Sequence, residues 1–212
     1  QSLPTESSPA FTEPLVIATT TTVRARVFQP GRLPGPVSSR TFLRLDPTLG
    51  NYNGSGQVFS SNLPVVILDS HGVRVDDTTN PGAARPYRPT YAVVIAPDPV
   101  TGRARLDGPV DYQGRSGTHV RGESSSGFNQ KSYAWETWNK KDQDKDESIL
   151  GMAAESDWAL IAPWSEKTML RNYLMFSTFD AARGDWVAPR TRFVEVFFNQ
   201  EPGQPVSYAD YR

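Results

Sequence analysis

Two short, fully apolar runs, each ended by turn-forming residues, constrain the fold of this chain more than any other feature. The first is LPVVIL at residues 63–68, followed by Asp-Ser-His-Gly. The second is YAVVIA at residues 91–96, followed by Pro-Asp-Pro. Runs of this length that are rich in Val and Ile and bounded by turn residues are typical of buried strands. They predict a sheet with a well-filled core from residue 63 onward.

Other segments of the same region also have strand character. In residues 131–138 apolar and polar side chains alternate, with Tyr133 and Trp135 in one phase. Residues 191–198 (TRFVEVFF) form a last strong candidate. Weaker candidates are residues 103–106, 110–112 and 119–121. Short strands separated by turns favour an antiparallel sheet.

One segment, residues 166–183, has the signals of a helix. Ser165 suits the N-cap, Glu166 lies in the first turn, and Gly184 follows as a stop. A wide apolar stripe predicts that this helix is buried inside the domain. The overall prediction is an α+β fold, an antiparallel-sheet-rich lobe with a central buried helix. The stripe consists of Leu170, Tyr173, Leu174, Ser177 and Ala181, flanked by Met169, Phe176 and Phe179.

The front of the chain has a separate β pattern. In residues 22–28, Val23, Ala25 and Val27 share one face, and a Gln-Pro-Gly turn leads to a return strand within residues 38–45. Two or three strands are marginal alone, so this module needs further strands or a neighbour. The following residues are rich in Gly, Ser and Asn and indicate a linker. The predicted division is a partial β-sandwich module at 1–45, a linker at 46–62 and the main domain at 63–212.

Composition excludes several classes of function. The formal net charge of −1 implies no global attraction to nucleic acid or anionic membranes, and no apolar run approaches the roughly 18 residues of a membrane helix. The absence of cysteine excludes disulfides, zinc-thiolate sites and cysteine nucleophiles. Asp142, Asp144 and Asp146 begin like a calcium loop, but Glu147 replaces the required Gly and Ala153 the required Glu. No metal ligand set is therefore predicted.

Residues 121–133 (RGESSSGFNQKSY) carry the strongest chemical signal. A Gly/Ser-rich loop between two strands can fold over phosphate groups, with backbone amides forming an anion-binding nest. A lysine on the return strand, here Lys131, can then bind the phosphates, as a strand lysine does in protein kinases. The alternative is an ordinary surface hairpin loop with no ligand. The residues alone leave both interpretations open.

Three sequence segments in this order resemble the CotH (spore coat protein H) kinase family over about residues 63–199. They are RGESSSGFNQKSY, the run SILGMAAESDWALIAPWSEKTMLRNYLMF at residues 148–176, and FVEVFFN at residues 193–199. The resemblance implies an atypical kinase fold that uses ATP with Mg²⁺ or Mn²⁺ to phosphorylate protein hydroxyl groups. It also implies a bacterial protein that is extracellular or lies at the cell surface or in the spore coat, with coat or surface proteins as substrates or partners.

The family's functional residues transfer only where the motifs match. By resemblance, the nucleotide-binding candidates are Arg121, Ser124, Ser125 and Lys131, with Arg171 and Glu195 as weaker ones. Ordinary structural roles stay open for the last two: a buried arginine that ties the helix to the sheet, and a glutamate at a solvent edge. Gln130 and Glu166 depart from the family pattern, which has a basic residue and an Asp there.

The resemblance also places the family's catalytic and metal-binding aspartates after Arg212, so we expect this chain alone to be inactive. The leading hypothesis is thus a fragment of a secreted or surface kinase. Two alternatives remain: a non-catalytic coat or surface protein that keeps the fold, and a fragment that pairs with a C-terminal fragment of the same precursor.

Residues 2–42 resemble a second family. A Pro-Thr turn, a Thr-rich approach and an Arg-Ala strand are similar to the chitobiase/hexosaminidase C-terminal, or fibronectin-III-associated, β module. Such modules serve as spacers or weak binders, which is the role the resemblance implies for this region.

Overall fold

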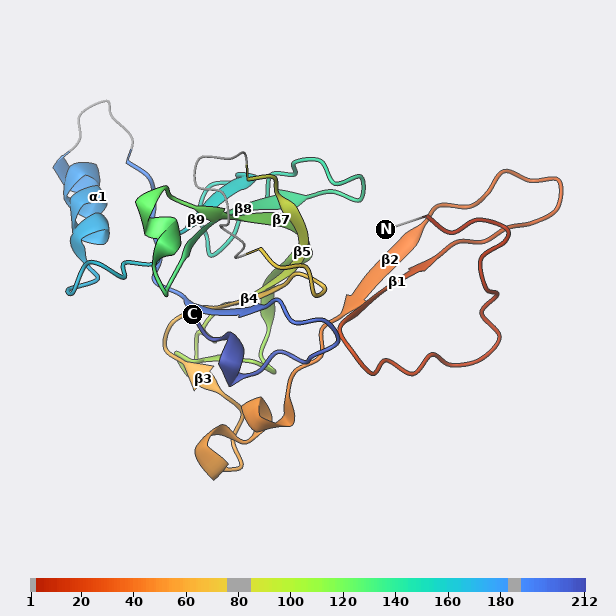
Figure 1. Ribbon diagram of the computed structural model, residues 1–212, viewed down its shortest axis with the longest axis horizontal. Helices are drawn as coiled ribbons and strands as arrows, with labels where there is room; N and C mark the ends of the chain where they lie inside the picture. The colour runs from red at the N-terminus through yellow and green to blue at the C-terminus, as the bar shows by residue number, and fades with distance from the viewer. Residues whose placement is uncertain (1–2, 76–84, 183–187) are drawn as a thin grey trace.

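The computed structural model describes residues 3–75, 85–182 and 188–212. Within them the protein is mostly β, with one α-helix, a six-stranded sheet and two two-stranded sheets, one of which forms the front, N-terminal module (Figure 1). The front sheet pairs β1 (Thr21–Ala25) with β2 (Ser38–Phe42) in antiparallel register, as the alternation predicts. It extends away from the larger sheet, which holds the main core (Figure 1).

The six-stranded sheet has the order β10-β4-β5-β7-β8-β9. Every neighbouring pair is antiparallel except β10 and β4, which run parallel. The predicted short strands at 110–112 and 119–121 are two ends of one long strand, β7. The bounds are β4 Val65–Asp69, β5 Arg88–Ile95, β7 Val110–Arg121, β8 Ser132–Trp138, β9 Asp157–Leu160 and β10 Glu195–Asn199.

The sheet is buried on both faces where β4, β5 and β10 meet. Successive residues of a strand point to opposite faces, and Leu68 and Phe198 pack in one apolar cluster while Ile67 and Phe197 pack in another. All five residues of β4 are buried. This explains why the runs at 63–68 and 91–96 are continuously apolar, whereas β8, covered on one face by the core, alternates.

The segment predicted to be a linker, residues 46–62, is folded against the second of these clusters. It contains two 3-10 turns, and its short strand β3 (Ser60–Ser61) pairs with β6 (Ala104–Arg105). Leu49 is 1% exposed and Phe59 packs edge-on against Phe197. An apolar side chain every few residues ties this Gly/Ser-rich stretch to the core. The 3-10 turns are η1 (Pro47–Gly50) and η2 (Tyr52–Gly54), and later in the chain η3 (Ser124–Gly127) and η4 (Tyr208–Asp210).

The helix differs from the prediction in both length and burial. α1 spans Arg171–Ala182, five residues shorter at its start, because Met169 has a left-handed φ of 56° and interrupts the helical backbone. The carboxylate of Glu166 accepts a hydrogen bond from the backbone N–H of Arg171, the first residue of the helix. None of the described helices has the length and apolar character needed to cross a bilayer.

The prediction of a central buried helix is wrong. No side chain of α1, all of which is described, is buried, and Leu174 and Met175 are 54% and 69% exposed. Among the described residues, an aromatic contact of α1 joins Tyr173 to Phe193, with ring centroids 4.9 Å apart. A wide apolar stripe predicts burial only where another element covers it, and no described element covers α1.

Candidate functional site

The loop between β7 and β8 is a tight, serine-rich turn. Arg121, the last residue of β7, pairs in register with Ser132, the first residue of β8, so the intervening residues close a short connection. Gly122 enters the turn with φ of 90°, and a Cβ there would collide with Ser125 Oγ. Three serines and Gly127 then form η3. Glycine is therefore required where the chain leaves the sheet.

Lys131 closes this turn from the β8 side. Its Nζ donates hydrogen bonds to the carbonyl oxygens of Ser126, at 2.6 Å, and Phe128, at 3.3 Å. The predicted phosphate-binding lysine therefore lies in the loop that the sequence singled out, and it is bound to the loop's own carbonyl groups. Within the turn the backbone amides of Ser126 and Phe128 donate to Glu123 and Ser125.

Arg85 holds the same turn from a distant part of the chain. Its guanidinium donates to the carbonyl oxygens of Gly122 and of Val120, the latter at 3.4 Å, and to the hydroxyl of Ser126 at 3.2 Å. Sequence reasoning missed this residue, because the surrounding polar, Pro-rich segment carries no pattern that links it to a loop 37 residues later. Two cations thus converge on one turn.

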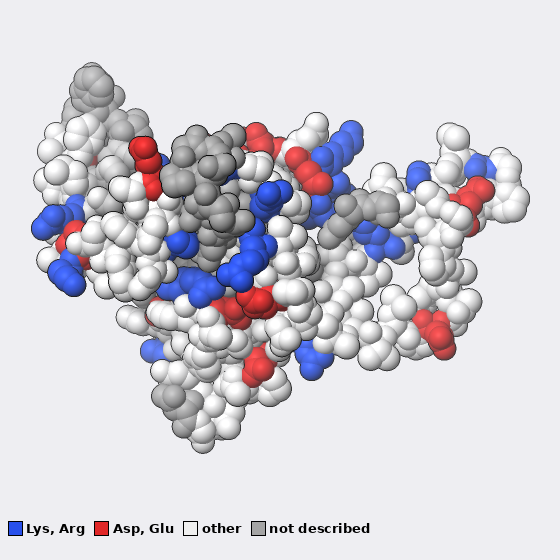
Figure 2. Space-filling view, in the orientation of Figure 1, with Lys and Arg blue, Asp and Glu red and all other residues white. Residues whose placement is uncertain are grey.

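The other predicted loop residues belong to the same turn or directly precede it. Arg121 and Ser124 are exposed, and Ser125 is half-buried beside Gly122. Lys and Arg side chains also gather across the middle of the face drawn in Figure 2. The turn thus combines the positive side chains of Arg85 and Lys131 with an exposed serine, Ser124, and an adjacent arginine, Arg121. Positive charges and hydroxyl donors of this kind are the groups that bind anions in proteins.

Arg171 is not brought to this turn by any described contact. It begins α1 with its side chain 80% exposed, and its guanidinium Nε lies 3.7 Å from the carboxylate of Glu166. The predicted structural role, a buried arginine that ties the helix to the sheet, is therefore wrong. A role in nucleotide binding stays a prediction.

Glu195 lies at the other end of the sheet. It pairs with Val65, and Val65 pairs with Ile95. Ile95 in turn pairs with the first residue of β7, whereas Arg121 is the last residue of β7. Its carboxylate accepts hydrogen bonds from Ser61, at 2.8 Å, and from the hydroxyl of Tyr211. Burial, and then this hydrogen bond, raise the pKa of Tyr211 to about 12. Glu195 thereby fastens the last residues of the chain to the edge strand.

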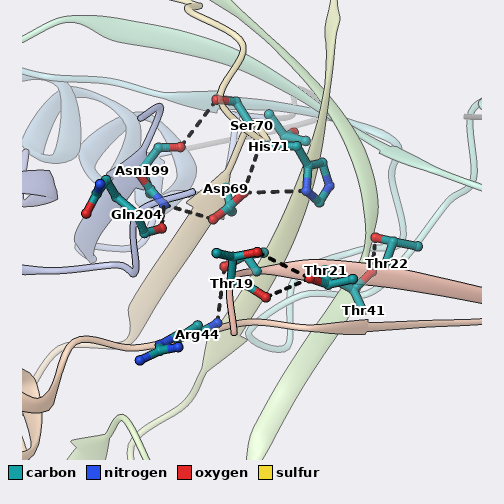
Figure 3. A network of polar contacts seen from close by, with 12 residues as sticks. Thr19, Thr21, Thr22, Thr41, Arg44, Asp69, Ser70, His71, Asn199 and Gln204 are labelled. Atoms are coloured by element: carbon teal, nitrogen blue, oxygen red, sulfur yellow. Dashed lines mark hydrogen bonds and ion pairs between the residues drawn. The ribbon is translucent and has the colours of Figure 1, made fainter. Parts of the chain in front are cut away.

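A second polar cluster lies where the front module meets the sheet (Figure 3). Asp69 and Asn199 end the parallel strands β4 and β10, and Asn199 Nδ2 donates to the Asp69 carboxylate at 3.0 Å and to the Gln204 carbonyl at 2.9 Å. His71 approaches the same carboxylate, with its Nδ1 3.6 Å away. Burial lowers the pKa of His71, opposed by Asp69 and assisted by Arg115.

This cluster borders a small pocket of about 60 Å³, whose wall includes Thr20 from the front module. Thr20 accepts a hydrogen bond from the backbone of Arg44 at 3.1 Å. The buried carboxylate of Asp69 already accepts hydrogen bonds from Asn199 and from the backbone N–H of His71, the latter at 2.8 Å. Its hydrogen-bonding capacity is therefore used within the protein, which indicates a structural role for the cluster.

The described residues do not gather a metal site. Nowhere in residues 3–75, 85–182 and 188–212 do three or more His, Cys, Asp or Glu side chains lie together so that they can hold a metal ion. Of the aspartates considered above, Asp142 instead forms an ion pair with Arg115.

Two family models match separate parts of the chain. Residues 118–204 match the family model described as CotH kinase protein, and residues 1–42 match the one described as Fn3 associated. The first match includes η3, Lys131, α1 and β10, while the predicted stretch from residue 63 to 117 lies outside it. Neither the curated proteins nor the solved structures that were compared gave a significant match. The chain is therefore similar to the CotH kinase protein family over residues 118–204 and to the Fn3-associated family over residues 1–42, in the order that the resemblance predicts.

Proposed function

We propose that this chain provides the nucleotide-binding part of a CotH-like kinase, which transfers phosphate from ATP to hydroxyl groups of proteins. The observation that carries the proposal is the convergence of Arg85 and Lys131 on the serine-rich turn η3, inside the segment that matches the CotH family. In this proposal Arg121, Ser124 and Ser125 line the phosphate-covering loop.

The chemistry of phosphate binding supports this assignment. A phosphate oxygen is a charged acceptor, and hydrogen bonds between charged partners are roughly twice as strong as neutral ones. Lys131 donates to two neutral carbonyl oxygens, of Ser126 and Phe128. A phosphate that binds here can replace these carbonyl groups as the acceptor, because its hydrogen bond to the lysine is the stronger one. When no phosphate is bound, the turn therefore holds the ammonium group of Lys131 in position.

The family resemblance further implies Mg²⁺ or Mn²⁺ with ATP, a protein substrate in the coat or at the cell surface, and a location outside the cell. The described residues offer no group of metal ligands, so we derive no step of phosphoryl transfer through a metal ion. The residues of this chain would bind and orient the phosphates, and the catalytic base remains unassigned.

A second function, a non-catalytic coat or surface protein that keeps this fold, is favoured by a different observation. The helix α1 and its flanks expose large apolar side chains, among them Trp164 and Phe179 at 49% and 45%. Exposed apolar clusters mark interaction sites in many proteins. Such a protein would keep the loop η3 without binding nucleotide.

Calorimetric titration of the intact protein with ATP, in the presence of Mg²⁺ or Mn²⁺, separates the two functions. Saturable binding of ATP, weakened by Lys131→Ala and unaffected by Lys141→Ala at an exposed lysine, supports the kinase proposal. Absence of any ATP binding by the wild-type protein with either metal ion would favour the structural function.

A further inference from the structure

The serine-rich turn depends on a cation that lies far from it in the sequence. Lys131 lies shortly after η3, and its two bonds reach the second half of the turn, at Ser126 and Phe128. Neither of these two bonds reaches the first half of the turn, where the chain leaves β7. Arg85 occupies that position, with bonds to the carbonyl oxygens of Val120 and Gly122.

The guanidinium group of Arg85 spans both halves of the turn. One nitrogen, Nη1, donates to the two carbonyl oxygens at the end of β7, and the other, Nη2, donates to Ser126 Oγ at 3.2 Å. The hydroxyl of Ser126 in turn donates to the carbonyl oxygen of Glu123 at 2.6 Å. A planar, forked donor can hold three acceptors at once in this way, whereas the single ammonium group of a lysine cannot copy the geometry.

Both cations meet at one residue. Ser126 accepts from Arg85 through its hydroxyl and from Lys131 through its carbonyl oxygen, and its side chain is buried. The two positive charges are therefore held on the same turn and fixed relative to each other. A site that binds the phosphates of a nucleotide gains affinity when its loop and cations are already in place, because less ordering is needed on binding.

We propose that Arg85 is a positioning residue for nucleotide binding: it fixes the turn η3, and thereby Lys131, in the arrangement that receives the phosphate groups. The inference rests on the proposed function, since it names a further residue of that site. It requires no contact between Arg85 and the nucleotide.

The proposal is tested on the intact protein with Arg85→Ala, Arg85→Lys and a matched control, Arg88→Ala, at an exposed arginine that begins β5. Hydrogen exchange is measured at the amides of Ser126 and Phe128, which are bonded inside the turn. Calorimetry then compares ATP with adenosine, which lacks phosphates. Circular dichroism establishes that each variant is folded.

We expect Arg85→Ala to accelerate exchange at the two amides and to weaken ATP binding by about tenfold, the equivalent of one charge-assisted hydrogen bond. Adenosine binding should not change, and Arg85→Lys should recover only part of both effects. Unchanged exchange in folded Arg85→Ala, or equal effects from Arg88→Ala, would overturn the proposal. If the wild-type protein binds no ATP, the proposed function fails while the exchange result still decides whether Arg85 fixes the turn.

Discussion

Lys131 Nζ lies 2.6 Å from the carbonyl oxygen of Ser126, five residues earlier in the chain, and donates a hydrogen bond to it. The lysine that we propose for phosphate binding is thus held by its own loop. This contact links the two roles that Lys131 can have, one in the fold of the turn and one in ligand binding. Variants of Lys131 that differ in charge and shape separate them.

We predict that Lys131→Met weakens ATP binding by about tenfold or more, because it removes the charge that a phosphate needs while keeping most of the apolar stem. Lys131→Arg keeps the charge and should retain most of the affinity. Calorimetric titration of ATP into each variant measures the effect, and Lys141→Met is the control on an exposed lysine. Equal affinities in wild type and Lys131→Met would remove Lys131 from the site.

Gly122→Ala should destabilise the turn for two separable reasons. Its φ of 90° disfavours any residue with a Cβ, and the added methyl group collides with Ser125 Oγ. We expect a loss of about 1–3 kcal/mol in the free energy of unfolding, measured in urea. Adding Ser125→Ala relieves the collision and should restore only part of this loss.

The matched control is Gly127→Ala in the same turn. A Cβ at Gly127 meets no atom within 4 Å, and its φ lies outside the left-handed region. The free energy of unfolding should therefore change by less than about 0.5 kcal/mol. Equal losses at Gly122 and Gly127 would contradict the conformation of the turn.

The junction between the front module and the sheet should lose stability in mild acid. Burial lowers the pKa of His71 below its ordinary value of 6.5, so the unfolded chain binds a proton there more readily than the folded protein does. The contribution of His71 is complete above pH 6.5 and decreases as the pH falls from 6.5 toward the folded pKa. Unfolding in urea at pH 7.5 and pH 5.5 measures this loss.

His71→Asn is the variant that tests the assignment. Asparagine tolerates the left-handed φ of 53° at this position, and it does not titrate. The difference in unfolding free energy between pH 7.5 and pH 5.5 should be smaller in His71→Asn than in wild type. An unchanged difference would show that other groups carry the pH dependence.

The sequence predicts the strands well, because the signals for them are local. The continuous apolar runs and the alternation of Tyr133 and Trp135 reflect burial on two faces or on one, and that burial is observed. The parallel pairing of β10 with β4 could not be foreseen, because it joins residues about 130 positions apart, such as Asn199 and Asp69.

The residues of the proposed site could be found from the sequence only in part, for a similar reason. Lys131 and the serine-rich turn are neighbours in the sequence, and the motif marks both. Arg85 lies in a segment with no periodic pattern, and its contacts arise only from the folding of β5 beside β7. The hydrogen bond from Tyr211 to Glu195 likewise depends on how the end of the chain returns to β10.

The exposure of α1 leads to the last prediction. Leu174 is 54% exposed and Phe198 is fully buried, although both are large apolar residues of the segment that matches the CotH family. Leu174→Glu should therefore change the free energy of unfolding by less than about 1 kcal/mol, since a surface substitution removes few contacts. Phe198→Ala should cost about 3–5 kcal/mol, because it empties a packed core position. Urea unfolding of this chain compares them, and a loss at Leu174 as large as that at Phe198 would mean that the helix is covered in solution.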